Sequence, residues 1–115
     1  MDDDIRQLAH LDRVIHEPLR LQIMTYLAVV ESADFLFLQR ELQATQGNLG
    51  AHLATLERAG YLTVEKTFVS RKPRTTFQIT GAGQAALTQY WTIMRDVGSH
   101  FPARAATAHP DLEVG

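Results

Sequence analysis

The pattern of apolar and polar positions predicts a chain built mostly of helices. Leu49, Leu53 and Leu56 recur at i, i+4 and i+7, which is the spacing of one face of an α-helix. Thr45 is a suitable N-cap for this helix, and Gly60 stands where a helix would end in a left-handed turn. We therefore predict a helix over residues 45–59.

Directly after this helix the apolar period changes to two. Leu62 and Val64 alternate with polar residues, and Phe77 and Ile79 flank Gln78 in the same way. This alternation predicts two half-buried strands, over residues 61–68 and 75–79. A basic turn joins them, with the sequence Ser70-Arg71-Lys72-Pro73-Arg74.

Other segments fit helices on both sides of this unit. Pro18 suits the first turn of a helix, and Thr80 is a plausible cap for a helix that follows the hairpin. Residues 31–34 are expected to form a loop. The remaining predicted elements are helices over 4–15, 18–30, 38–43 and 84–97, and a short third strand over 35–37.

The order of these elements predicts a winged helix-turn-helix, a mainly α fold with a small β-hairpin (α+β). We expect one domain over residues 1–97, because 115 residues are too few for a second core. Residues 98–115 mix Gly, Pro, Ala and charges without periodicity, which predicts a flexible C-terminal tail.

Composition narrows the class of protein. The chain has no cysteine, no apolar run that approaches the ~18 residues of a membrane helix, and an acidic start, Met1-Asp2-Asp3-Asp4, unlike a signal peptide. A cytoplasmic protein without a cofactor, metal site or membrane partner is therefore expected. A Gly-rich phosphate loop, an HExxH motif and a convincing Ser/His/Asp set are also missing from the sequence, which argues against an enzyme.

The distribution of charge favours a nucleic-acid partner more than the net charge of −2 does. Residues 1–44 hold four basic and eight acidic residues, whereas residues 45–83 hold five basic and only two acidic ones. The positive excess therefore coincides with the helix and hairpin described above. Such a modest excess predicts salt-sensitive binding that a dimer would strengthen.

The outward side of the 45–59 helix carries small or amide-bearing residues and no acid in its first turns, which suits a DNA major groove. Amides pair with adenine, a histidine donates to guanine or to phosphate, and an alanine methyl meets thymine. Gly47 is expected to allow close approach to DNA and Gly50 to allow tight packing of two helices, with mere tolerance as the alternative. The predicted contacts of this helix are Thr45, Gln46, Gly47, Asn48, Ala51 and His52.

Phosphate contacts are predicted on both sides of this helix. The preceding helix offers Gln39 and Arg40, and the hairpin turn, residues 70–75, offers Ser70, Arg71, Lys72 and Arg74. A solvated helix face and an ordinary solvated turn are the alternatives.

An apolar stripe on the first and last helices predicts a dimer interface, the alternative being that it packs only on its own domain. Its members are Ile5, Leu8, Leu11, Ile15, Leu87, Tyr90, Trp91, Met94 and Val97.

The segments HEPLRLQIMTYL, QGNLGAHLATLERAGYL and RKPRTTFQIT resemble the winged helix-turn-helix regulators of the MarR/ArsR-like superfamily, especially the small stand-alone members. The resemblance covers about residues 10–95. It implies a homodimer that binds a partly palindromic operator through a recognition helix at 45–59 and a wing at 70–75. Metal sensing is disfavoured, because the chain has no cysteine and its five histidines form no i, i+4 pair.

We therefore predict a sequence-specific, double-stranded-DNA-binding transcriptional regulator, acting as a repressor. The alternative is a winged-helix protein-interaction module that does not bind DNA. A refinement of the first reading is a sensor of an unknown small-molecule effector, with a pocket lined by Tyr26, Phe35, Tyr90, Trp91 or Met94.

Overall fold

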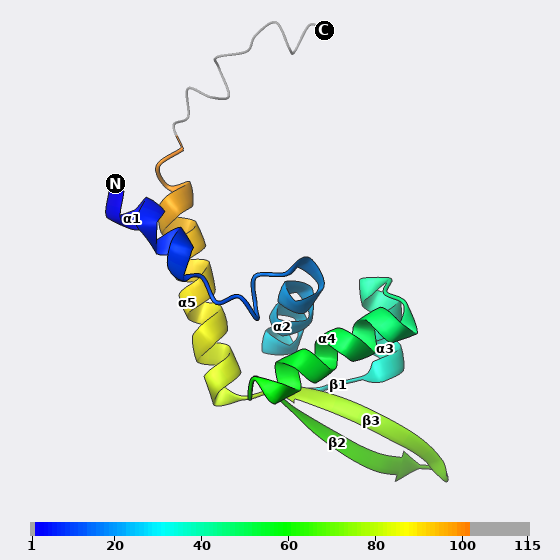
Figure 1. The fold of residues 1–115 in the computed structure, drawn as a ribbon. Coiled ribbons are helices and arrows are strands. Elements are labelled where there is room, and N and C mark those ends of the chain that lie inside the picture. Colours follow the sequence, from blue (N-terminus) through cyan, green and yellow to red (C-terminus); the bar gives the residue numbers. More distant parts are fainter. Residues whose placement is uncertain (1, 102–115) are drawn as a thin grey trace, which may run out of the picture.

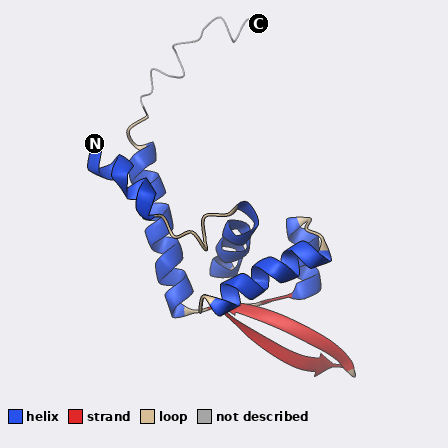
Figure 2. Cartoon of the chain, viewed as in Figure 1, coloured by secondary structure: helices blue, strands red, loops and turns tan. Residues whose placement is uncertain are grey.

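The computed structural model describes residues 2–101 and consists of helices and a small sheet whose hairpin projects away from them (Figures 1 and 2). The helices before the sheet hairpin are α1 (Asp2–Arg6), the 3-10 helix η1 (Gln7–His10), α2 (Pro18–Val29), α3 (Phe35–Leu42) and α4 (Gln46–Arg58). The strands are β1 (Ala33–Asp34), β2 (Leu62–Val69) and β3 (Lys72–Ile79), and the chain continues into α5 (Gly81–Gly98). The predicted helices that start at Pro18 and after Thr45 are therefore confirmed.

The sheet is antiparallel with the order β1-β3-β2. Leu62 pairs with Ile79 at the base of the hairpin, and Val69 pairs with Lys72 at its tip. Only Ser70 and Arg71 form the turn, both with positive φ, 52° and 69°. The predicted five-residue turn is thus wrong, because two left-handed residues let the strands continue to the tip in a tight hairpin.

The core lies where α2, α4 and α5 meet the base of the sheet. Ile15, Ile23, Leu38, Leu49 and Leu56 are completely buried there. Phe77 and Leu62 contribute the inner face of the hairpin to the same cluster. The leucine stripe that predicted α4 is therefore its core face.

Side-chain caps fix where the helices begin. The hydroxyls of Thr45 and Thr80 accept hydrogen bonds from the backbone N–H groups of Asn48 and Gly83, as predicted for N-caps. Glu17 caps α2 by accepting from the backbone N–H of Arg20. Gly60 has a φ of 82°, which confirms the predicted left-handed turn after α4.

The predicted helix over residues 4–15 is wrong in its second half. The helical segment ends at His10, and Leu11 is extended with a ψ of 141°. The carboxylate of Asp12 accepts hydrogen bonds from the backbone N–H groups of Val14 and Ile15. This local turn satisfies backbone donors that a continuing helix would have used.

The predicted strand over residues 35–37 is also wrong. Phe35 begins α3, because Asp34 accepts a hydrogen bond from the backbone N–H of Phe37 and caps the helix. The third strand does exist, but it is formed by the preceding residues, Ala33 and Asp34, which pair with Phe77 and Thr76. The segment expected as a loop therefore supplies the strand.

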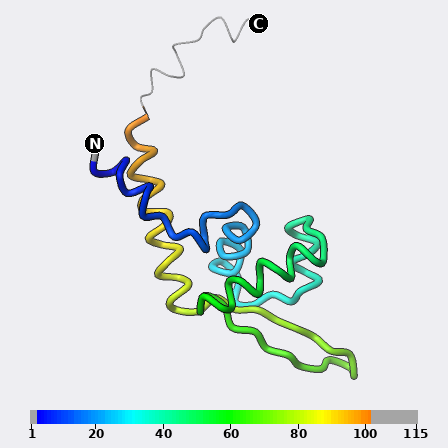
Figure 3. Tube along the Cα trace, in the orientation of Figure 1, coloured from blue at the N-terminus to red at the C-terminus, as the bar shows by residue number. Residues whose placement is uncertain are grey.

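Helix α1 packs along the C-terminal half of α5, and the two together stand out from the remaining helices (Figure 3). The imidazole Nε2 of His100 lies 2.7 Å from the Asp4 carboxylate and links the two segments. We call α1, η1 and the C-terminal half of α5 the arm. The predicted flexible tail beyond residue 101 lies outside the described residues.

The structure corrects part of the predicted dimer interface. Leu11, Ile15, Leu87 and Tyr90 are buried in the core of their own chain and are therefore not available to a second copy. Met94 and Val97 pack partly against the same core. The members with exposed side chains are Ile5, Leu8 and Trp91.

Candidate nucleic-acid interface

Helix α4 presents its first turns to solvent. Gln46, Gly47, Asn48 and Ala51 are exposed, whereas Leu49 and Leu53 hold the opposite face in the core. From Gln46 to Leu56 the helix contains no acidic residue. The exposed surface is therefore slender, neutral and rich in groups that can meet base edges.

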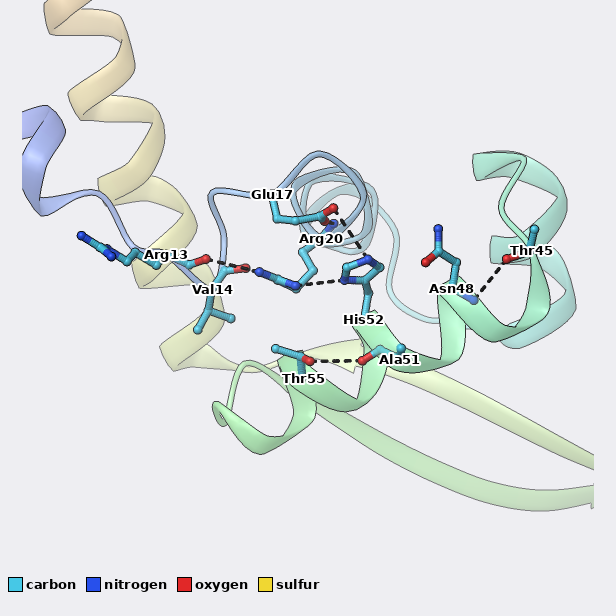
Figure 4. A network of polar contacts seen from close by, with 9 residues as sticks. All are labelled: Arg13, Val14, Glu17, Arg20, Thr45, Asn48, Ala51, His52 and Thr55. Atoms are coloured by element: carbon cyan, nitrogen blue, oxygen red, sulfur yellow. Dashed lines mark hydrogen bonds and ion pairs between the residues drawn. The ribbon is translucent and has the colours of Figure 1, made fainter.

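His52 does not belong to this exposed surface, which corrects the prediction that it faces the groove. Its Nδ1 lies 2.9 Å from a guanidinium nitrogen of Arg20, and its Nε2 lies 3.6 Å from a carboxylate oxygen of Glu17 (Figure 4). Arginine can only donate, so Nδ1 of His52 accepts and Nε2 carries the proton toward Glu17. The imidazole therefore joins α4 to the first turn of α2.

Arg20 extends this connection to the segment before α2. Its guanidinium also donates to the backbone carbonyl oxygens of Val14 and Arg13 (Figure 4). One side chain thus contacts α4 and the 11–17 segment that leads back to the arm. The position of α4 is set by polar contacts as well as by its leucines.

Gly47 and Gly50 both face open space. A Cβ atom built on either residue meets no atom within 4 Å. The expected tight helix packing at Gly50 is therefore wrong. Gly47 is exposed on the side of Gln46 and Asn48, so a partner could approach its backbone closely.

The hairpin carries the basic groups that were predicted to contact phosphate. Ser70, Arg71 and Lys72 are exposed at its tip, and neither Arg71 nor Lys72 forms an ion pair with another described residue. Arg74 is different, because its guanidinium lies 3.2 Å from the Asp34 carboxylate. Since Asp34 also caps α3, Arg74 fixes the hairpin to that helix.

On α3, Gln39 is half-buried and Arg40 is exposed. Arg40 and Arg74 both border a polar hollow of about 390 Å³ beside β1. Of the two predicted contacts of this helix, Arg40 is thus the one with a free side-chain surface.

Tyr61 fixes the C-terminal end of α4. Its hydroxyl donates to the Asp12 carboxylate, and its backbone carbonyl accepts from the backbone N–H of Thr80. The hydrogen bond to Asp12, with burial and the nearby negative charge, raises the pKa of Tyr61 to about 12. The residue therefore links the 11–17 segment, α4 and the start of α5.

An apolar groove of about 580 Å³ runs between α2 and α5. Tyr26 and Trp91 line it, as expected for a sensor pocket, together with Val29 and Leu42. The other expected lining residues lie elsewhere. Tyr90 is buried with its hydroxyl 3.0 Å from Nδ1 of His16, Phe35 borders a hollow beside the hairpin, and Met94 packs against the core.

Residues 2–101 contain no cluster of three or more His, Asp or Glu side chains placed to hold a metal ion. No helix within this range is both long and apolar enough to span a membrane.

Comparison with known proteins identifies the family. The model of the winged helix DNA-binding domain matches residues 19–97, which include α2, the α3–α4 pair and the hairpin. The chain belongs to this family. The winged helix DNA-binding family and the winged-helix fold expected from the sequence are therefore confirmed. The two solved structures described below are named as transcriptional regulators or their homologues, not as enzymes.

Solved and curated relatives of this winged-helix protein agree with that assignment. A transcriptional regulator homologue from Pyrococcus horikoshii superposes with a TM-score of 0.77 at 29% identity, covering 84% of this chain and 95% of the other. The regulator BldR from Sulfolobus solfataricus, at 17% identity, shares the fold with a TM-score of 0.61 over 98% and 81% of the two chains. An uncharacterized protein of Methanocaldococcus jannaschii is 30% identical over 78 residues, 68% of this chain and 85% of that protein.

Sequence reasoning missed two residues of this surface. Arg20 gave no signal, because only the folded chain brings it to His52, 32 positions away. Phe68 falls within the predicted strand over residues 61–68 and was given no role, yet 76% of it is exposed. No local pattern marks this exposure, because it depends on the hairpin tip extending beyond the helices that could cover it (Figure 1).

Proposed function

We propose that this winged-helix protein is a sequence-specific transcriptional repressor that binds a partly palindromic operator as a homodimer. The amino-terminal half of α4 enters the major groove, and the basic hairpin contacts the flanking phosphates. The observation that carries the proposal is the exposed, acid-free surface of Gln46, Asn48 and Ala51 on a helix whose end leads directly into a basic hairpin.

The chemistry of these side chains supports reading of bases. Gln46 and Asn48 offer amides that pair with the N6 and N7 edge of adenine, and Ala51 offers a methyl group to thymine. Arg71 and Lys72 supply positive charge that carries little sequence information but positions the protein on the duplex.

The two-fold symmetry of a homodimer supports a partly palindromic operator. Two copies joined through their arms would present two α4 helices related by a two-fold axis, so a matching operator repeats its half-site in inverted order. Repression is the simplest result of such binding, because it requires only that the dimer occupies the promoter.

The test is selection of bound duplexes from a random-sequence library by the full-length protein, across a salt series. We expect enrichment of an inverted repeat, and affinity that falls as salt rises. Gln46→Ala and Asn48→Ala should each weaken binding to the selected duplex about tenfold, because each variant loses a base contact. Binding to random DNA should change little.

A charge-matched pair of variants controls this test. Arg71→Ala/Lys72→Ala should weaken binding to selected and random duplexes alike. It should also reduce the slope of affinity against salt by the amount that corresponds to about two phosphate contacts. Arg13→Ala/Arg58→Ala removes the same charge from exposed positions outside both the hairpin and the arm and should change neither. A folded protein that enriches no duplex at low salt would overturn the proposal and favour the protein-interaction module.

Repression itself is tested by transcription in vitro from a template that carries the selected duplex within its promoter. Transcript yield should fall as the operator fills, and a scrambled duplex should abolish the effect. An increase in transcript yield would replace repression by activation.

A further inference from the structure

The tip of the hairpin carries an exposed aromatic side chain. Phe68 is 76% exposed and pairs across the strands with Pro73. Because side chains alternate along a strand, both lie on the face that holds Leu62 and Val64 at the base. At the base that face packs into the core, whereas at the tip it carries an uncovered apolar pair.

Positive charges surround this pair. Lys66 precedes Phe68 on the same face, and Arg71 and Lys72 follow in the turn and the next strand. The single acid of the two strands, Glu65, pairs with Thr76 on the opposite face. Cations outnumber acids around the tip, since Asp34, the acid that borders the same hollow as Pro73, is paired with Arg74. An apolar pair in such a setting complements a polyanion with apolar recesses better than it complements a neutral or basic protein surface.

We propose that Phe68, with Pro73 beside it, enters the minor groove of the bound DNA and packs on its deoxyribose walls. Apolar residues such as phenylalanine and proline serve as minor-groove contacts in other DNA-binding proteins. The inference rests on the proposed function, and it adds an apolar contact to a wing that would otherwise act by charge alone.

The dimensions of the hairpin fit this placement. The hairpin begins just after the C-terminal end of α4, at the base of β2. Its two strands have eight residues each and span about 26 Å, which is more than the ~12 Å width of a major groove. The hairpin tip and the amino-terminal end of α4 point to the same side of the molecule (Figure 1). One duplex can therefore hold α4 in its major groove and Phe68 in the adjacent minor groove.

The test compares variants on the duplex that the wild-type protein selects from random DNA. Phe68→Ala should weaken binding about tenfold, the loss expected when part of a buried phenylalanine surface is removed. Phe68→Leu should retain most of the affinity. Val69→Ala is the matched control, because Val69 is also exposed, at 47%, but lies on the opposite face of the hairpin. The affinity of this variant for the selected duplex should stay within about twofold of wild type.

Salt dependence separates the apolar contact from the charged ones. Phe68→Ala should leave the slope of affinity against salt unchanged, whereas Arg71→Ala/Lys72→Ala should reduce it. Hydroxyl-radical footprinting should show restored cleavage of the flanking minor groove with Phe68→Ala and unchanged protection at the centre of the site.

Each outcome bears on a distinct claim. If the wild-type protein selects no duplex, the proposed function fails and the Phe68 contact fails with it. If the wild type binds and Phe68→Ala binds equally well, or Val69→Ala loses as much, only the Phe68 contact is overturned. Thermal unfolding of every variant, expected to match wild type, shows that a loss of binding is not a loss of fold.

Discussion

At the scale of single residues, His52 shows how a polar residue on the helix proposed to read DNA, α4, can serve the fold. Arg20 and Glu17 hold both ring nitrogens, and the side chain is only 20% exposed. A base contact by His52 would require these interactions to break. The major-groove contacts of α4 are therefore expected from its neighbours Gln46, Asn48 and Ala51.

Replacing His52 tests this division of roles. His52→Ala leaves Arg20 and Glu17 without their partner, so we expect unfolding free energy, measured by urea denaturation, to fall by about 1–2 kcal/mol. Affinity for the selected duplex should fall less than with Asn48→Ala. A His52→Ala protein of wild-type stability that loses as much affinity as Asn48→Ala would place His52 in the groove instead.

Tyr61 makes stability depend on pH at the alkaline end. Its pKa is about 12 in the folded chain against an ordinary 10, so the folded state holds the proton more tightly. The stabilisation is fully present below pH 10 and is lost as pH rises through 12. Because the side chain is only partly buried, we expect a total effect of about 1 kcal/mol.

Tyr61→Phe removes the hydroxyl that donates to Asp12 and should flatten this dependence. The measurement is urea denaturation at intervals from pH 8 to pH 12, interpreted as the difference between variant and wild type. Tyr26→Phe is the control, since the Tyr26 hydroxyl has no hydrogen-bond partner among residues 2–101. Parallel curves for wild type and Tyr61→Phe would show that the Asp12 contact does not stabilise the fold.

At the scale of elements, the junction between the hairpin and α5 depends on a close backbone approach. A Cβ atom on Gly83 would lie 2.5 Å from the backbone carbonyl oxygen of Tyr61. That carbonyl also accepts the hydrogen bond from Thr80, the N-cap of α5. Gly83 thus lets α5 start directly against the end of α4.

Gly83→Ala should therefore destabilise the protein by about 1–3 kcal/mol, because the contact is with backbone and cannot be relieved by a rotamer change. Gly81→Ala, in the same first turn but with open space around it, should have little effect or stabilise slightly. Thermal unfolding of the two variants measures the difference. Equal melting temperatures would show that the junction can widen at no cost.

The helices and the hairpin were predictable because their signals are local. Thr45 and Thr80 cap the helices they precede, and the leucine stripe of α4 is its buried face. The errors arose where a side chain competes for backbone donors. Asp12 ends the first helical segment and Asp34 starts α3 early, and neither effect appears in a pattern of apolar spacing.

The candidate site was predictable in position but not in detail. Exposure of Gln46 and Asn48 follows from helical periodicity, since they lie opposite the leucines. His52 is held away from the exposed surface by Arg20, 32 positions earlier in the chain, and Arg74 pairs with Asp34, 40 positions earlier. Only the folded chain brings these residues together. The same applies to Phe68, whose exposure depends on where the covering helices end.

At the scale of the whole molecule, the 11–17 segment lies between the arm and α4. Asp12 contacts Tyr61 at the end of α4, His16 contacts Tyr90 on α5, and Arg20 binds both this segment and His52. A change in how α1 and α5 sit would therefore reach α4 through contiguous polar contacts. We expect dimer formation and DNA binding to be energetically coupled.

Dimerisation through the arm is testable because its exposed apolar residues are identified. Ile5 is 45% exposed and Leu8 is 39% exposed, so charge at either position leaves the monomer core intact. We expect the wild type to sediment at twice the 12.9 kDa chain mass and Ile5→Glu/Leu8→Glu to sediment as a monomer.

The Ile5→Glu/Leu8→Glu variant should keep its affinity for a single half-site but bind the inverted repeat at least about tenfold more weakly, because a dimer engages both halves at once. Leu36→Glu, a change at a leucine of α3 that lies outside the arm and is more exposed, at 68%, should remain dimeric. A wild-type monomer at micromolar concentration would overturn the homodimer, whereas a dimeric arm variant would place the interface elsewhere, with the apolar groove between α2 and α5 as the next surface to change.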